Sequence, residues 1–246
     1  MFLKETEAIV LRTFKLAEAD KIAVFLTRRY GLVRGVAKGA RRMKSRFGAS
    51  LEPFTLIVLG FHEKEGRELL SIRHTEIVRS FFSLAKENEA VAGLEYLSEL
   101  AIEFAPPHQP DERFYRMMKA CLAAVEEAPS RWPALVRYFE IWALRLSGFL
   151  ADVDTCGACG RDLSSVRQGH VYATPEFILR CEACASRTEL KLNSDVYNLI
   201  RAAKREPPQG WAEQFINARQ QSQDSIALMM RALVERHLER RPRGTI

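Results

Sequence analysis

The apolar pattern of this 246-residue chain changes its period near residue 80, and this change constrains the fold more than any other feature. Before it, short runs rich in Val, Ile, Leu, Phe and Thr alternate with turn residues, which is typical of strands. After it, apolar residues recur about every 3.6 positions, which is typical of amphipathic helices. We predict five strands, at residues 7–14, 21–27, 32–37, 53–61 and 68–78.

The strand pattern predicts a small β domain at residues 1–80. Tyr30 and Gly31 separate the second and third strands, and glycine supplies the positive φ of a tight hairpin there. The connection after the third strand, residues 38–52, is too long and too charged for a simple hairpin. Five short strands with this one long connection favour a closed barrel of the oligonucleotide-binding (OB) type, and an SH3-like barrel is the alternative.

Apolar stripes at helical spacing predict a mainly helical domain at residues 81–246. The first stripe ends at Pro106 and Pro107, because proline cannot continue the helical hydrogen bonds, and Asp111 is the expected N-cap of the second. Three stripes are formed by Ala90, Leu94, Leu97, Ala101 and Phe104, by Phe114, Met118, Cys121 and Val125, and by Leu135, Phe139, Trp142, Leu146 and Phe149.

Two further helices are expected near residues 194–204 and 224–238, with a loop at Glu206–Trp211 and a frayed end at residues 240–246. We therefore predict an α+β protein, in which an OB-fold barrel precedes a helical domain. No apolar run reaches the roughly 18 residues of a membrane-spanning helix, and the acidic N-terminus does not match a signal peptide. We expect a cytoplasmic protein with no membrane partner.

Two C-x-x-C pairs predict a zinc module at about residues 153–187, inserted in the helical domain. Cys156 and Cys159 form the first pair, Cys181 and Cys184 the second, with 21 residues between the pairs. Two such knuckles supply four thiolates for one Zn²⁺ ion, and the intervening segment at residues 167–180 has the alternation of a hairpin. Because four thiolates fill the coordination shell, we expect a structural ion. The alternative is two redox-active or merely buried pairs.

Two other potential ligands have simpler interpretations. His170 lies between the knuckles and is expected on the surface of the hairpin. Cys121 belongs to an apolar helix stripe and is expected to be a small buried hydrophobic residue.

Positive charge is concentrated in the N-terminal third of the chain. The first 80 residues hold 16 basic and 9 acidic residues, so the remainder of the chain, whose total charge is +6, carries −1. Residues 21–51 contain nine basic residues and no Asp or Glu. Such a localised field attracts a polyanion, so we predict nucleic-acid binding. The expected DNA contacts are Arg28, Arg29, Arg34, Lys38, Arg41, Arg42, Lys44 and Arg46.

Phe47 is the best candidate to stack on a base, because an aromatic ring beside cations binds single strands of any sequence. Tyr30, Phe54 and Phe61 are more typical of a barrel core or rim. We find no phosphate-binding loop, dinucleotide fingerprint, metalloprotease motif or nucleophile elbow. The remaining acids, among them Glu63, Glu65, Asp152 and Asp154, are expected to be solvated in polar turns. We therefore expect a protein that is not an enzyme.

The stretch at residues 7–59 resembles the N-terminal domain of the RecO family of bacterial recombination mediators. The resemblance includes a Thr-x-x-x-Gly hairpin at Thr27–Gly31, an Ala-Lys-Gly-Ala-Arg segment at Ala37–Arg41 and Ser-Arg-Phe at Ser45–Phe47. The helical middle and the Cys-Gly ending at Cys159–Gly160 are similar to the rest of that family. Some members lack the four cysteines, so the metal prediction rests on the ligand spacing.

The resemblance implies an OB-fold domain, a helical domain and a role in DNA repair and homologous recombination. RecO proteins bind single- and double-stranded DNA, anneal complementary strands, and work with RecR and the RecF pathway. They help to load the recombinase RecA onto gaps covered by single-stranded DNA-binding protein, whose C-terminal tail they bind. The resemblance thus implies a bacterial, nucleoid-associated protein. A tail pocket beside helices that contain Arg137, Arg145, Arg201 or Lys204 is one option, because it needs a cation next to apolar side chains.

Two other functional classes remain open from the residues themselves. A barrel with a zinc ribbon is also compatible with an RNA-binding or transcription-associated adaptor. A zinc hydrolase or deaminase would require an open coordination position, which four cysteine ligands do not leave.

Overall fold

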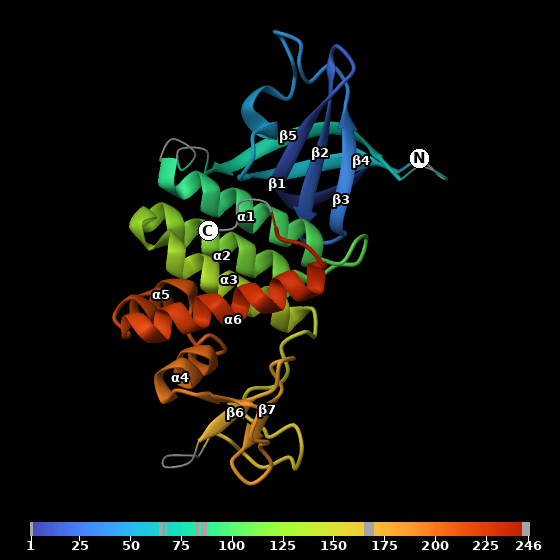
Figure 1. Cartoon of the computed structure of the whole chain (residues 1–246). Coiled ribbons are helices and arrows are strands. Elements are labelled where there is room, and N and C mark those ends of the chain that lie inside the picture. Colours follow the sequence, from blue (N-terminus) through green and yellow to red (C-terminus); the bar gives the residue numbers. More distant parts are fainter. Residues whose placement is uncertain are drawn as a thin grey trace. The chain divides into compact units, whose positions relative to one another are not determined.

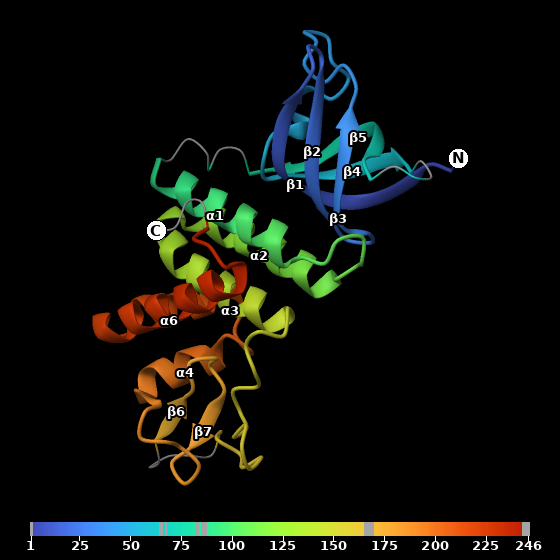
Figure 2. The ribbon, with the colours of Figure 1, turned by 45° about the vertical axis from the view of Figure 1, so that its right-hand side comes forward.

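The structure is a computed structural model that describes residues 2–63, 66, 68–81, 84, 88–164 and 170–242, with residues 88–90 described for the backbone only. The chain packs as two compact units, one ending at Pro129 and the other spanning Ser130–Pro242, and each is described by itself (Figures 1 and 2). The domain boundary expected after residue 80 stays a prediction. Glu65, residues 167–169, the end from residue 243 and the side chain of Ala90, all part of the expectations above, lie outside the described set.

The first unit contains the expected five-stranded barrel. Its order is β1-β2-β3-β5-β4, closed by pairing of β1 with β4, and β3 and β5 meet in parallel at Gly35 and Val36. A register shift between Val10 and Arg12 lets the long first strand bend from one neighbour to the other. The strands are β1 (Lys4–Leu16), β2 (Asp20–Thr27), β3 (Gly31–Ala37), β4 (Thr55–His62) and β5 (Leu70–Ser80).

Apolar residues at alternate strand positions fill the barrel. Ala8, Val10, Ala23 and Phe25 belong to the same buried cluster as Phe61. The alternation of the sequence is therefore the alternation between the inside and the outside of the barrel. The long connection after β3 ends in a short 3-10 helix, η1 (Gly48–Leu51).

Two helices complete this unit. α1 (Asn88–Phe104) lies against β1, where the Ser98 hydroxyl donates a hydrogen bond of 2.6 Å to the Leu11 carbonyl. α2 (Glu112–Glu127) begins as expected at Asp111, whose side chain accepts from the Phe114 N–H. The two buried faces match the expected stripes, so the helix period was read correctly from the sequence.

The second unit combines four helices with a small sheet. After the 3-10 turn η3 (Pro129–Arg131), the helices are α3 (Trp132–Leu146), α4 (Ser194–Ala202), α5 (Pro208–Ile216) and α6 (Gln220–Leu238). The sheet has the order β7-β6-β8, from β6 (Val171–Ala173), β7 (Leu179–Cys181) and β8 (Leu190–Leu192). Trp211 is fully buried, and its indole N–H donates to the Leu199 carbonyl over 2.7 Å.

Two expectations for this unit were wrong, and one strand was missed. The loop expected at Glu206–Trp211 ends at Pro207, because Pro208 occupies the first turn of α5, where a missing N–H costs nothing. α3 ends at Leu146, which leaves Phe149 beyond the helix and 45% exposed. Strand β8 was not expected. Among the described residues, no helix combines the length and apolar character that crossing a membrane requires.

Candidate metal centre and nucleic-acid interface

The four predicted cysteines come together in the second unit. The Sγ atoms of Cys156, Cys159, Cys181 and Cys184 all lie within 4.8 Å of one another. Tetrahedral zinc–sulfur bonds of about 2.3 Å require sulfur–sulfur distances near 3.8 Å, and the Cys159–Cys181 distance is 3.9 Å. The donor set and its spacing therefore fit a closed tetrahedral site for one soft divalent metal.

Backbone hydrogen bonds shape the two knuckles. The Cys181 N–H donates to the Cys156 sulfur over 3.4 Å, and the Gly160 N–H donates to the Cys156 carbonyl over 2.8 Å. The Gly157 N–H donates to the Leu179 carbonyl of β7, which joins the first knuckle to the small sheet. The knuckles are therefore held by the chain's own backbone.

Ionisation of the cluster is set by burial and hydrogen bonding. Burial opposes the charge of Cys156, but N–H groups of Cys181, Cys159 and Ala158 outweigh it and lower its pKa to about 6. Hydrogen bonds with the thiols of Cys159 and Cys181 raise the pKa of Cys184 to about 12. A divalent cation bound at this point would favour the thiolate form of all four side chains.

The two other potential ligands lie where they were expected. His170 is exposed and lies 3.8 Å from Glu182, outside the sulfur cluster. Cys121 is fully buried on α2 in the other unit, and burial raises the pKa of its thiol.

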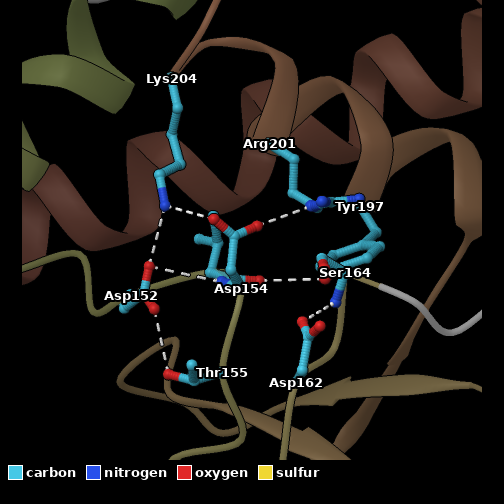
Figure 3. Close-up of polar contacts among 9 residues, drawn as sticks. Asp152, Asp154, Thr155, Asp162, Ser164, Tyr197, Arg201 and Lys204 are labelled. Atoms are coloured by element: carbon cyan, nitrogen blue, oxygen red, sulfur yellow. Dashed lines mark hydrogen bonds and ion pairs between the residues drawn. The ribbon is translucent and has the colours of Figure 1, made fainter.

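An ion-pair network next to the first knuckle corrects the expectation that Asp152 and Asp154 are merely solvated (Figure 3). The Arg201 Nε lies 2.8 Å from an Asp154 oxygen, and Lys204 bridges Asp154 and Asp152, with 3.0 Å to the latter. Burial raises the pKa of both carboxyls, but the Lys204 hydrogen bonds and their other partners outweigh it and lower both pKa values. The loop before the cysteines is thus fastened to α4.

Helical spacing could have revealed this network. Tyr197, Arg201 and Lys204 lie on one face of the α4 region, and the Tyr197 hydroxyl donates to the Val153 carbonyl over 3.1 Å (Figure 3). The sequence does not show which acids lie opposite this face, so the ion pairs with Asp152 and Asp154 were not predicted. Because Arg201 and Lys204 are engaged with carboxylates, neither is a free cation for the tail pocket considered above.

Arg137 and Arg145, the other two cations considered for the tail pocket, also have close partners. Arg137 is buried and lies 2.9 Å from Glu140, and the Arg145 guanidinium lies 5.3 Å from the centre of the Trp142 ring. No place for a tail pocket follows from these four residues.

In the barrel, the predicted basic residues gather mainly in the loop that follows β3, which we call the basic loop (residues 38–46). The five cations Lys38, Arg41, Arg42, Lys44 and Arg46 are all exposed. Within the described ranges, none of them forms an ion pair with an acid. Their charges therefore remain available to an external polyanion.

The basic loop is fastened to the β1–β2 turn at the same end of the barrel (Figure 2). The Arg41 guanidinium donates to the carbonyls of Ala17 and Glu18, both over 2.9 Å. The Gly39 N–H donates to the Asp20 carboxylate over 2.8 Å. Arg41 therefore orders the loop, whereas Arg42 and Lys44 are exposed, and their side chains form no hydrogen bond or ion pair with the described residues.

The structure does not bring every predicted DNA contact to this end. Arg28 and Arg29 lie in the β2–β3 hairpin at the opposite end, separated from Lys38 by the seven residues of β3, or about 23 Å. Arg28 lies 2.7 Å from Glu112, which raises its pKa. Arg34 is exposed midway along β3. The predicted DNA contacts therefore form one cluster in the basic loop, and Arg28, Arg29 and Arg34 lie outside it.

Phe47 does not have the accessibility that base stacking requires. Its side chain is only 3% exposed and belongs to the barrel core, with the Arg46 guanidinium 4.9 Å from the ring centre. The residue was predicted to stack on a base because it follows four cations in six positions, but its apolar ring is buried in the core of the barrel. In this structure the Phe47 ring is therefore not accessible to a base.

Comparison with known proteins agrees with both halves of this architecture. The chain matches the family described as "Recombination protein O N terminal" over residues 1–81 and "Recombination protein O C terminal" over residues 86–245. Curated relatives named "DNA repair protein RecO" include those of Anaeromyxobacter dehalogenans, 38% identical over 72% of this chain and 68% of the relative, and Geobacter metallireducens, 33% identical over 73% and 71%.

A third relative of the same name, from Koribacter versatilis, is 33% identical over 65% of each chain. The two family matches together cover the barrel, the helices and the cysteine cluster. The chain therefore belongs to the RecO family of DNA repair and recombination proteins.

Proposed function

We propose that the chain is a recombination mediator that binds single- and double-stranded DNA through the basic loop. The observation that carries this proposal is the group of five exposed cations at one end of the barrel, without acid partners among the described residues. Counterion release from phosphates is the main source of affinity for such a surface. Arg34 extends the proposed surface along β3, and Arg28 and Arg29 are outlying members.

We further propose that the protein anneals complementary strands without catalysing a covalent step. Two strands repel each other through their phosphates, and a surface that neutralises both lowers the cost of bringing them together. Base pairing then proceeds without a nucleotide cofactor, in agreement with a sequence that contains no phosphate-binding loop.

The proposed partners follow from the family. They are RecR and the RecF pathway, the C-terminal tail of single-stranded DNA-binding protein, and RecA, which the protein would help to load onto covered gaps. The proposed location is the bacterial cytoplasm, at the nucleoid. For the metal we propose one structural Zn²⁺ ion held by Cys156, Cys159, Cys181 and Cys184, because four thiolates leave no open position for a substrate or water.

The DNA-binding proposal is tested by the salt dependence of affinity. The double variant Arg42→Ala, Lys44→Ala removes two exposed cations whose side chains form no hydrogen bond or ion pair with the described residues. Each phosphate contact to a single strand contributes about 0.7 to the slope of log affinity against log salt, so the slope should decrease in magnitude by about 1.4. Fluorescence anisotropy of a labelled oligonucleotide measures it.

The matched control is Arg113→Ala, Arg116→Ala, which removes the same charge from exposed positions on α2. We expect its slope to equal that of the unmodified protein. Equal losses in both double variants would mean that net charge, and not the basic loop, governs binding. Strand annealing measured with the same proteins should follow the affinity.

A further inference from the structure

A groove in the first unit lies between the outer face of β1 and helix α1. Its volume is about 370 Å³, within the range of sites that hold small ligands. The walls are mainly apolar and include one cation and two acids, of which Glu95 is exposed and Glu99 is buried. The lining includes Leu11, Arg12, Phe14, Phe54, Leu94 and Glu95.

Phe14 is the unusual residue of this groove. The residue is 49% exposed although it lies in a paired stretch of β1, opposite Ile22 of β2. Arg12 shares the groove, and Lys15 is the next residue along β1. Within the described chain, the Arg12 side chain forms no hydrogen bond or ion pair. An exposed aromatic face beside an available guanidinium is the combination that binds a nucleobase and its phosphate.

The groove is held open by the fold. On one side, the hydrogen bond from Ser98 to Leu11 fixes α1 against β1. On the other side, Phe54 adopts a φ of 61°, which is costly for a bulky side chain. Its N–H donates to the Val10 carbonyl over 2.7 Å, and its carbonyl accepts from the Phe81 N–H over 3.1 Å. The strained residue thus stays in place with its ring against the groove.

The chain connects the groove to the basic loop at two points. Phe14 lies three residues before Ala17, whose carbonyl accepts from Arg41. Pro53 and Phe54 line the groove and lie directly after the connection that begins with the basic loop. Three residues of extended chain span at most about 10 Å, so one single strand can contact both the basic loop and the groove.

We propose that this groove binds one unstacked base of single-stranded DNA, with Phe14 as the stacking surface and Arg12 beside the adjoining phosphate. This proposal rests on the DNA-binding function proposed above. Glu95 is exposed on the α1 side of the groove and repels phosphates, so the backbone runs along the Arg12 side and only the uncharged base enters. Bases of a duplex are already stacked and paired, so the groove adds affinity for single strands alone.

The test compares Phe14→Ala with Phe14→Trp. Loss of one base–aromatic stack lowers single-strand affinity by about 5-fold or more, and the duplex affinity stays unchanged. The slope against salt also stays unchanged, because no phosphate contact is removed. Phe14→Trp restores the affinity, and its added fluorescence is quenched by a single strand. An abasic oligonucleotide of equal length binds the unmodified protein and Phe14→Ala equally.

The control is Phe149→Ala, which removes an aromatic ring of similar exposure, 45%, from the other unit and leaves single-strand affinity unchanged. Equal affinity of Phe14→Ala and the unmodified protein for single strands overturns the proposal, and would leave the groove to a protein ligand. A loss that is equal for duplex or abasic strands also overturns it. The Arg42, Lys44 variant separates the two proposals, because its reduced slope supports the basic loop whatever the outcome at Phe14.

Discussion

At the scale of single residues, Gly31 meets two requirements that only glycine satisfies. Its φ is 63°, in the left-handed region that side chains disfavour, and it begins β3 directly after the hairpin. A Cβ atom at this position would lie 2.2 Å from the Gln109 carbonyl oxygen and 2.6 Å from that of Pro106. Both neighbours are backbone, which cannot move aside as a flexible side chain can.

Gly31→Ala should therefore destabilise the barrel unit far more than Gly48→Ala. Gly48 also has a positive φ, of 48°, but a Cβ atom added there would meet nothing within 4 Å. The Gly48 variant should cost about 1 kcal/mol from backbone strain alone, and the Gly31 variant at least about 2 kcal/mol more. Urea denaturation followed by circular dichroism measures both, and similar midpoints would show that the 106–109 segment yields to the added methyl group.

At the scale of elements, the loop before the first knuckle and helix α4 are joined by charge. The Asp154 side chain is 24% exposed and accepts from Arg201 on α4 and from Lys204 in the turn that follows this helix. The backbone of this loop is also bound, because the Leu163 N–H donates to the Asp154 carbonyl over 2.7 Å. Asp154 therefore connects this loop to the α4 region through its carboxylate and to the segment at Leu163 through its backbone carbonyl.

Asp154→Asn should lower the free energy of unfolding of the second unit by about 1 kcal/mol at neutral pH. The pKa of Asp154 is lowered in the folded protein, so its contribution is complete above the unfolded value of about 3.9 and is lost as the pH falls through the lowered value. The difference between variant and unmodified protein should therefore shrink below about pH 4. Trp132, Trp142 and Trp211 all lie in this unit, so tryptophan fluorescence reports it.

The matched control for this prediction is Asp224→Asn, an exposed carboxylate on α6. Its unfolding curve should coincide with that of the unmodified protein at neutral pH. A difference between Asp154→Asn and the unmodified protein that persists unchanged to pH 3 would argue against the ion pairs as its cause.

At the scale of the whole molecule, the proposed DNA surface and the metal centre belong to different compact units. The basic loop is part of the unit that ends at Pro129, and all four cysteines of the cluster lie in Ser130–Pro242. Damage to the metal centre should therefore be transmitted to DNA binding only weakly.

Cys181→Ser should abolish the bound zinc and lower the tryptophan-reported stability of the second unit, because metal binding contributes to its folding energy. The slope of DNA affinity against salt should stay unchanged. Metal analysis, fluorescence unfolding and anisotropy measure the three quantities. Cys121→Ala is the control, since this buried thiol lies on α2 and is not a member of the cluster, and the zinc content of this variant should equal that of the unmodified protein. Retention of zinc by Cys181→Ser would refute the four-cysteine site.

The sequence by itself determined the features that depend on local spacing. The barrel strands follow from a period of two, the first helices from a period of 3.6 and the Asp111 cap, and the sulfur cluster from two C-x-x-C pairs. In each case the pattern of neighbouring residues restricts the geometry directly, because backbone periodicity is the same in every protein.

Only the tertiary structure decided which side chains of equal chemistry are buried and which are available. Phe47 and Phe14 are both phenylalanines near cations, but Phe47 is buried in the barrel core and Phe14 lies half-exposed in a groove. Arg201 and Arg42 are both arginines, but within the described chain only the first has carboxylates beside it. These outcomes depend on contacts between segments far apart in sequence, and a local pattern carries no information about which distant segment will lie opposite.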